Sequence, residues 1–328
     1  MRDIQSIRHH LHQHPELSGQ EHCTHDYLVD CLRECQPTAL HTHVGGHGIV
    51  ALFGTPRIAI RADIDALPIG HRCGHDGHAA ILLRLAQMQP HDVMLIFQPA
   101  EEVGTGSKAV IESGLIARYR PQHIFGFHNI TGYPLGQVLL REGTFAMAST
   151  GLEITLQGRP THASTPELGL NPGLAVSELI PLLQPTLIYA RVGEEAYGTS
   201  AGDATLGFTL RRERTEELEA LVSQAKSHVL QVAERHGLQS STRMVDPFPA
   251  TRSHPEALAL LRRAAPEALT LAQPFRWSED FGQYPGSTCF FGLGAGEDHV
   301  ELHHPDYDFP DALIEPAAQL LMRLTTIN

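Results

Sequence analysis

The stretch Arg61–His78, RADIDALPIGHRCGHDGH, decides how the chain is organised. A short apolar run at 57–60 precedes it and predicts a strand, and residues 79–88 follow it with the apolar spacing of a helix. The polar side chains between them therefore lie at a strand-to-helix crossing, where open α/β sheets place their chemistry. Cys73 and His75 supply a thiol and an imidazole, which are ligands of divalent transition metals. One Cys-x-His among 22 histidines is weak evidence until further ligands are found.

More polar side chains follow two later apolar runs. The run DVMLIF at 92–97 is followed by Glu101 and Glu102, and the run IFGF at 124–127 ends at His128. Because the carboxyl ends of parallel strands share one edge of a sheet, we expect these side chains to meet the first cluster. Adjacent glutamates beside a buried strand are costly unless a metal or a reaction uses them.

Composition excludes several classes of protein. A formal charge of −13 argues against a nucleic-acid partner, because phosphates demand a basic surface. No run approaches the roughly 18 apolar residues of a membrane span, and the polar N-terminus has no apolar signal core. Five cysteines are a sparse, odd set that fits reduced thiols better than disulfides. We therefore expect a cytoplasmic protein without a membrane partner.

The pattern of elements changes near residue 149. From there the order strand-helix-strand-strand-helix-strand is that of the split βαβ, ferredoxin-like unit. We expect residues 149–246 to form an inserted α+β lid and dimerisation domain. Residues 1–148 and 247–328 would form an α/β catalytic domain, with a central mixed, mostly parallel sheet flanked by helices.

Three local expectations follow from the same pattern. Residues 45–53 and 57–60 are expected to form a hairpin that enters the central sheet. Thr24 is expected to cap the second helix, which would run to about Glu34. The segment Asp-Pro-Phe-Pro at 246–249 is expected to be the linker that returns the chain to the first domain.

The chain resembles the di-metal amidohydrolases, because eight motifs of that family occur in the same order. These motifs are RHHLHQHPELS, RADIDALP, CGHDGH, FQPAEE, FGFHN, THASTP, SEDF and LHHPDYDF. The family includes hippurate hydrolase, aminoacylases and indole-acetyl-amino-acid hydrolases, and is kin to carboxypeptidase G. The resemblance covers nearly the whole chain. It implies a catalytic domain that holds two metal ions and an inserted lid through which two chains form a homodimer.

The resemblance also implies a ligand set for two divalent ions: Cys73, His75, Glu102, His128 and His303. His303 is chosen over His304 because the family's pattern is Leu-His-x-Pro. Members use manganese, zinc, cobalt or nickel, and the sequence does not choose among these metals.

Catalytic roles are carried over in the same way. Glu101 would take a proton from the hydrolytic water and pass it to the leaving amine. His162, supplied by the partner subunit, would stabilise the oxyanion. Arg211 would bind a substrate carboxylate, although a solvated strand-end arginine explains it equally well. The acidic residues of the first stretch would orient ligand imidazoles, with a helix cap or a turn as the alternative: Asp63, Asp65 and Asp76.

The chain departs from the family in two places. Only residues 69–72 separate RADIDALP from CGHDGH, where relatives carry a longer loop. The lid is shortened around 192–203, the usual Asn-x-Ile-Pro is replaced at 198–201, and Glu167 stands where histidine is frequent. These losses spare the metal ligands but put substrate recognition and lid closure in doubt.

The favoured hypothesis is hydrolysis of the amide bond of N-acyl amino acids. A dipeptidase or carboxypeptidase on the same scaffold is the first alternative. A metal-holding binding protein without turnover is the second, but buried charged ligands are costly to keep without use. A cysteine nucleophile is the weakest alternative, because a metal would occupy the Cys73 thiolate.

Overall fold

The computed structural model describes residues 1–183 and 186–327. They form two compact units: Met1–Ala146 together with Thr251–Asn328, and Met147–Ala250. Each unit has its own hydrophobic core. The roles of catalytic domain and lid remain predictions.

An eight-stranded mixed sheet forms the centre of the first unit, in the order β1-β2-β4-β3-β5-β16-β6-β15. Its central strands run parallel to one another, whereas β1, β2 and β6 pair antiparallel with neighbours. This is the mixed, mostly parallel sheet that the sequence predicts. The strands are β1 (Ala39–Val44), β2 (Gly48–Phe53), β3 (Ile58–Asp63), β4 (Val93–Gln98), β5 (His123–Ile130), β6 (Val138–Leu140), β15 (Leu269–Thr270) and β16 (Ser287–Gly294).

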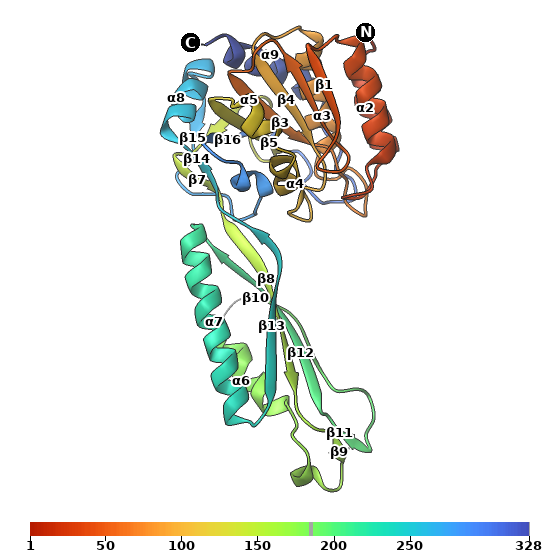
Figure 1. The fold of residues 1–328 in the computed structure, drawn as a ribbon, viewed down its shortest axis with the longest axis vertical. Coiled ribbons are helices and arrows are strands. Elements are labelled where there is room, and N and C mark those ends of the chain that lie inside the picture. Colours follow the sequence, from red (N-terminus) through yellow and green to blue (C-terminus); the bar gives the residue numbers. More distant parts are fainter. Residues whose placement is uncertain (184–185, 328) are drawn as a thin grey trace. The chain divides into compact units, whose positions relative to one another are not determined.

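Helices cover both faces of this sheet (Figure 1). One face packs against α1 (Ile4–Gln13), α2 (His22–Glu34), α3 (His75–Gln87), α8 (Pro255–Ala264) and α9 (Ile314–Thr326), and the other against α4 (Gly106–Glu112) and α5 (Leu115–Tyr119). In β2, Ile49 and Ala51 belong to the first core and Val50 and Leu52 to the second. Burial on both faces explains why these strands read as continuous apolar runs.

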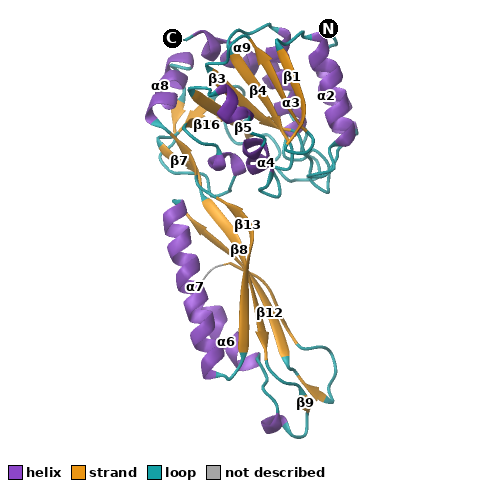
Figure 2. Cartoon of the chain, viewed as in Figure 1, coloured by secondary structure: helices purple, strands orange, loops and turns teal. Residues whose placement is uncertain are grey.

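The second unit has the predicted order βαββαβ. Its elements are β8 (Ala148–Gln157), α6 (Gly173–Leu183), β10 (Thr186–Val192), β12 (Asp203–Arg212), α7 (Thr215–Arg235) and β13 (Gln239–Phe248). The antiparallel sheet has the order β10-β12-β8-β13, and both helices lie along one of its faces (Figure 2). Alternate residues of β8, Leu152, Ile154 and Leu156, are buried in the core between sheet and helices.

The structure corrects three local predictions. β2 pairs with β1 and β4, so it forms no hairpin with β3. Thr24 lies inside α2, whose N-cap residue is Glu21. The first three residues of the predicted return linker, 246–248, belong to β13, because this strand continues past a register shift to pair Phe248 with Ser149.

Short elements complete the fold. β7 (Gly143–Ala146) pairs with β14 (Thr251–Ser253) in the first unit, and β9 (Thr161–His162) pairs with β11 (Thr199–Ser200) in the second. Within the described residues, no helix has the length and apolar character needed to cross a membrane.

Candidate metal centre

The stretch that links β3 to α3 turns sharply at Gly74. Gly74 is the N-cap of α3 and has a φ of 96°, a left-handed conformation that favours glycine. A Cβ at this position would lie 2.6 Å from the side chain of Asn129. Cys73 and His75 therefore flank a position that only glycine can occupy, at the carboxyl edge of the sheet.

The five predicted ligands come together at this edge. Cys73 Sγ lies 3.5 Å from His128 Nε2 and 3.3 Å from His303 Nε2. His75 Nε2 lies 3.9 Å from Glu102 Oε1. The ligand atoms of Cys73, His75 and His128 all lie within 4.8 Å of one another, as do those of Cys73, Glu102 and His303. These two groups share the Cys73 thiol, an arrangement that suits two neighbouring ions.

The side chains present fit a divalent transition metal. His75 Nε2 and Glu102 Oε1 are buried, yet neither has a hydrogen-bond partner among the described residues. Buried polar atoms without partners are costly, and a cation would satisfy both. Thiolate, imidazole and carboxylate together favour ions of the zinc, cobalt, nickel or manganese group over magnesium.

The charges of the centre depend on one another. Burial lowers the pKa of His75, but the carboxylate of Asp63 and the thiolate of Cys73 outweigh it and hold this pKa well above its ordinary value. Burial, together with the neighbouring carboxylates of Glu279 and Glu102, raises the pKa of Glu101 well above that of an exposed glutamate. Glu101 is only 6% exposed. Glu101 is therefore not an ordinary solvent-exposed glutamate.

Two of the three predicted orienting aspartates contact the centre. The Asp65 carboxylate accepts hydrogen bonds from the Glu102 N–H (3.0 Å) and the Ser18 hydroxyl (2.7 Å). His75 Nδ1 donates to the Asp65 backbone carbonyl (3.0 Å) and lies 3.3 Å from the other carboxylate oxygen. Asp63 Oδ1 lies 3.8 Å from His75 Nε2. Asp65 thus connects a candidate ligand imidazole to the backbone of a candidate ligand carboxylate.

The third aspartate, Asp76, has different partners. Its Oδ2 lies 2.8 Å from His12 Nδ1 and 3.4 Å from Arg8 Nη1, so it joins α3 to α1. Asp76 therefore holds the N-terminal helix against the helix that begins with His75.

The backbone is left-handed at two non-glycine residues of the site. His303 has a φ of 65°, and Ala100, next to Glu101, has a φ of 53°. Such conformations are costly and persist where the surroundings enforce them, often at functional sites. The Ala100 N–H donates to Glu21 Oε1 (2.9 Å), and the His303 N–H donates to the Arg72 carbonyl (2.8 Å).

Sequence reasoning left His78 out of the site. Its Nδ1 lies 2.5 Å from Asp63 Oδ1, its Nε2 contacts Asn129 Oδ1, and the Asn129 amide donates to the Tyr307 hydroxyl (2.5 Å). His75 and His78 are three residues apart at the start of one helix, and this spacing was the available signal.

The structure places His162 and Arg211 in the second unit. His162 is exposed on β9, with Nδ1 2.7 Å from Ser164 Oγ, and it pairs with Thr199 of β11. The segment 198–201, which replaces the family's usual motif, therefore supplies the strand that pairs with His162. Arg211 is the penultimate residue of β12. Their catalytic roles remain predictions.

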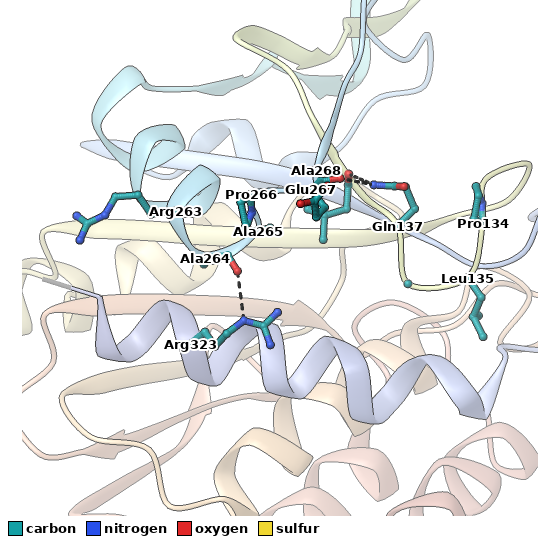
Figure 3. Close-up of a pocket in the computed structure, with 12 residues that line it drawn as sticks. Pro134, Leu135, Gln137, Arg263, Ala264, Ala265, Pro266, Glu267, Ala268 and Arg323 are labelled. Atoms are coloured by element: carbon teal, nitrogen blue, oxygen red, sulfur yellow. Dashed lines mark hydrogen bonds between the residues drawn. The ribbon is translucent and has the colours of Figure 1, made fainter.

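A surface cavity of about 660 Å³ lies apart from these residues, on the first unit (Figure 3). The loop before β6, the end of α8 and Arg323 of α9 line it. Among its lining residues, Arg323 donates to the Ala264 carbonyl (3.2 Å) and Gln137 to the Glu267 carbonyl (3.0 Å). None of the predicted ligands lines this cavity, so it is not the candidate centre.

Comparisons with known proteins agree on one family. The model of peptidase family M20/M25/M40 matches residues 59–326. An N-acetyl-L-cysteine deacetylase of Bacillus subtilis is 30% identical over 362 aligned positions, which cover 96% of this chain and 85% of that protein. The hippurate hydrolase of Campylobacter jejuni is 27% identical, with 98% and 95% covered. The crystal structure of a dinuclear metal-binding M20 peptidase from Bacillus subtilis has a TM-score of 0.84 at 26% identity, with 98% and 96% covered.

The alignment with the deacetylase is longer than the chain. Its 362 positions exceed the 328 residues present here, so this chain lacks residues that the relative has. The segment at 69–72 and the lid remain the predicted positions of these losses.

Proposed function

Because the chain belongs to peptidase family M20/M25/M40, we propose that it is a metal-dependent amidohydrolase that cleaves the amide bond of N-acyl amino acids. The convergence of thiol, imidazole and carboxylate ligands beside the buried Glu101 supports this most directly. Two relatives bear the names of hydrolases of N-acetyl-L-cysteine and of hippurate, which supports the substrate class.

Two divalent ions would be held by the ligand set Cys73, His75, Glu102, His128 and His303. When bound, such ions polarise a substrate carbonyl and lower the pKa of a coordinated water toward about 7. The carboxylate of Glu101 takes the proton of the attacking water and gives it to the leaving amine. The burial that raises the pKa of Glu101 favours the first step, because a carboxylate with a raised pKa accepts the proton of the water more readily.

The remaining roles belong to positioning and recognition. Asp65 fixes the position of the His75 ring relative to the Glu102 backbone. His162 donates a hydrogen bond to the oxyanion, and Arg211 pairs with the carboxylate of the amino-acid part of the substrate.

We also propose a homodimer formed through the second unit. β10 is at one edge of its sheet, and an edge strand offers unpaired backbone groups to a second copy. Leu187, Ile188 and Val192 of this strand are 40%, 61% and 40% exposed. The five cysteines are free thiols, and the cytoplasm is the proposed location.

The test is amine release from a panel of N-acyl amino acids and dipeptides, with the stripped protein reloaded with manganese, zinc, cobalt or nickel. Glu101→Gln should keep both ions of the candidate centre and lose about 10²- to 10⁴-fold in turnover. Glu112→Gln is the matched control, because Glu112 is a solvent-exposed glutamate of α4. Unchanged turnover in Glu101→Gln would remove this residue from its role. No cleavage by the wild type with the candidate centre occupied would favour a metal-holding binding protein.

A further inference from the structure

Four histidines gather on the first unit, apart from the candidate centre. His22 and His25 lie one turn apart in α2, His43 is near the end of β1, and His47 lies in the turn between β1 and β2. The ring centres of His22 and His47 are 4.0 Å apart, and those of His25 and His43 are 4.2 Å apart. The centres of His25 and His47 are 6.4 Å apart. Segments separated in sequence thus bring four imidazoles together, in the order His22, His47, His25 and His43.

The backbone of the β1–β2 turn is constrained near His43 and His47. His43 has a left-handed φ of 56°, and the pairing of β1 with β2 is irregular between His41 and Val44. Gly45 follows with a φ of 62°, and a Cβ there would lie 2.6 Å from the backbone of Ala109 in α4. The turn is therefore pressed against α4, and the positions of His43 and His47 follow from it.

Hydrogen bonding leaves ring nitrogens of this cluster available. His25 is 2% exposed, and its Nδ1 donates to the His47 carbonyl at 2.8 Å. A neutral ring that donates from Nδ1 carries its lone pair on Nε2, and metal-binding histidines are oriented by this kind of bond. His47 Nδ1 is buried and has no hydrogen-bond partner among the described residues. Such a nitrogen is costly to leave without a partner.

We propose that His22, His25, His43 and His47 form a further metal site that takes one divalent ion of the zinc, nickel or copper type. Imidazole is a ligand that these ions share, whereas manganese and magnesium prefer oxygen. Two imidazoles that share an ion through bonds of about 2.0–2.1 Å have ring centres on the order of 4.5–6.5 Å apart. His25 and His47 already have such a separation. The rings of His22 and His43 lie 4.0 and 4.2 Å from their neighbours, which is closer than this range. Both residues are exposed, so their side chains are free to rotate on binding.

An ion at this site would join the start of α2 to the β1–β2 turn. Glu21, the N-cap of α2, is also the acceptor for the Ala100 N–H beside Glu101. The proposed site is therefore connected through Glu21 to the loop that carries Glu101. It shares no ligand with the candidate di-metal centre.

The test counts zinc ions bound by the full-length, metal-free chain in competition with a chromophoric chelator. The wild type should bind one equivalent more than His22→Gln/His43→Gln, whose substituted residues are both exposed. His9→Gln/His91→Gln is the matched control, because these histidines are exposed outside the cluster, and it should bind as the wild type does.

A variant that lacks ligands of the candidate centre distinguishes metal binding at this site from binding at that centre. In Cys73→Ser/His128→Asn one equivalent should remain, and adding His22→Gln/His43→Gln should lower its affinity at least tenfold. With Cu²⁺ as the probe, the electron paramagnetic resonance spectrum of that equivalent should show coupling to several imidazole nitrogens. Equal zinc binding by the wild type and His22→Gln/His43→Gln would overturn the proposal, as would a copper spectrum without nitrogen coupling.

Discussion

Arg61 is a fully buried cation beneath the candidate centre. Its guanidinium lies 2.6 Å from Asp63, 3.0 Å from Glu279 and 2.9 Å from Asp280, and it also donates to Gln98 Oε1 (2.9 Å). Each of these charges would cost several kcal/mol to bury alone, and their pairing offsets that cost. Burial lowers the pKa of Arg61, but the surrounding carboxylates raise it well above its ordinary value. Arg61 thereby fixes Asp63, which in turn holds His78.

Replacement of Arg61 should therefore make the protein easier to unfold. We expect Arg61→Met to lower the free energy of unfolding by about 3–5 kcal/mol, because it leaves three carboxylates buried without their partner. Urea unfolding measures this change. Arg84→Met is the control, because its pair with Glu315 is solvent-exposed and should be worth at most about 1 kcal/mol. Equal losses in the two variants would contradict this account of Arg61.

At the scale of the element, the first turn of α3 depends on Gly74. Gly74→Ala should weaken metal binding at least about tenfold, because a Cβ would push Asn129 and displace Cys73 and His75. Gly114→Ala is a matched control: Gly114 has a φ of 79° at the N-cap of α5, but no atom of the described residues beyond its chain neighbours lies within 4 Å of its Cβ position. Both variants should pay a similar strain of about 1 kcal/mol. Metal titration should then separate them, and equal affinities would show that the contact with Asn129 has no effect.

Elements that depend on local periodicity were predictable, whereas pairing was not. The apolar runs of β4 and β5 indicate buried strands, and their parallel ends explain why Glu102 and His128 meet Cys73. The predicted hairpin was wrong because β4, from a later segment, inserts between β2 and β3. Local sequence does not specify which strand pairs with which. β1 was missed because its core-facing signal is weak, with residues 39–43 only partly buried or exposed.

The site, too, was predictable only in part. The CGHDGH and QPAEE motifs identify ligand types, but the contacts of Asp76 and His78 depend on α1 and on the Asn129 side chain, which lie far away in sequence. The cluster of His22, His25, His43 and His47 likewise requires a helix to meet a turn. Among 22 histidines, no spacing along the chain selects these four.

At the scale of the whole molecule, the proposed dimer depends on the edge of β10. Ile188→Asp should convert a dimer into a monomer, because a charge on this edge strand opposes pairing with a second copy. Sedimentation velocity measures the outcome. Leu230→Asp is the control, because Leu230 is 56% exposed on α7, which packs on β8, β12 and β13, and it should leave the dimer intact. A wild type that sediments only as a monomer would contradict the proposal.

The dimer also predicts how two inactive variants behave when mixed. Glu101→Gln lacks the proposed base, and His162→Ala lacks the proposed oxyanion donor. If His162 acts in the partner's site, a mixed dimer contains one site with an intact Glu101 and an intact His162 from the other chain. Random exchange of equal amounts should then restore about a quarter of wild-type activity, because half the dimers are mixed and each has one working site. If His162 served its own subunit, no site in any dimer would be complete, and the mixture would stay as inactive as its parts. Addition of Ile188→Asp to both variants should abolish the recovery, because restoration requires the second copy.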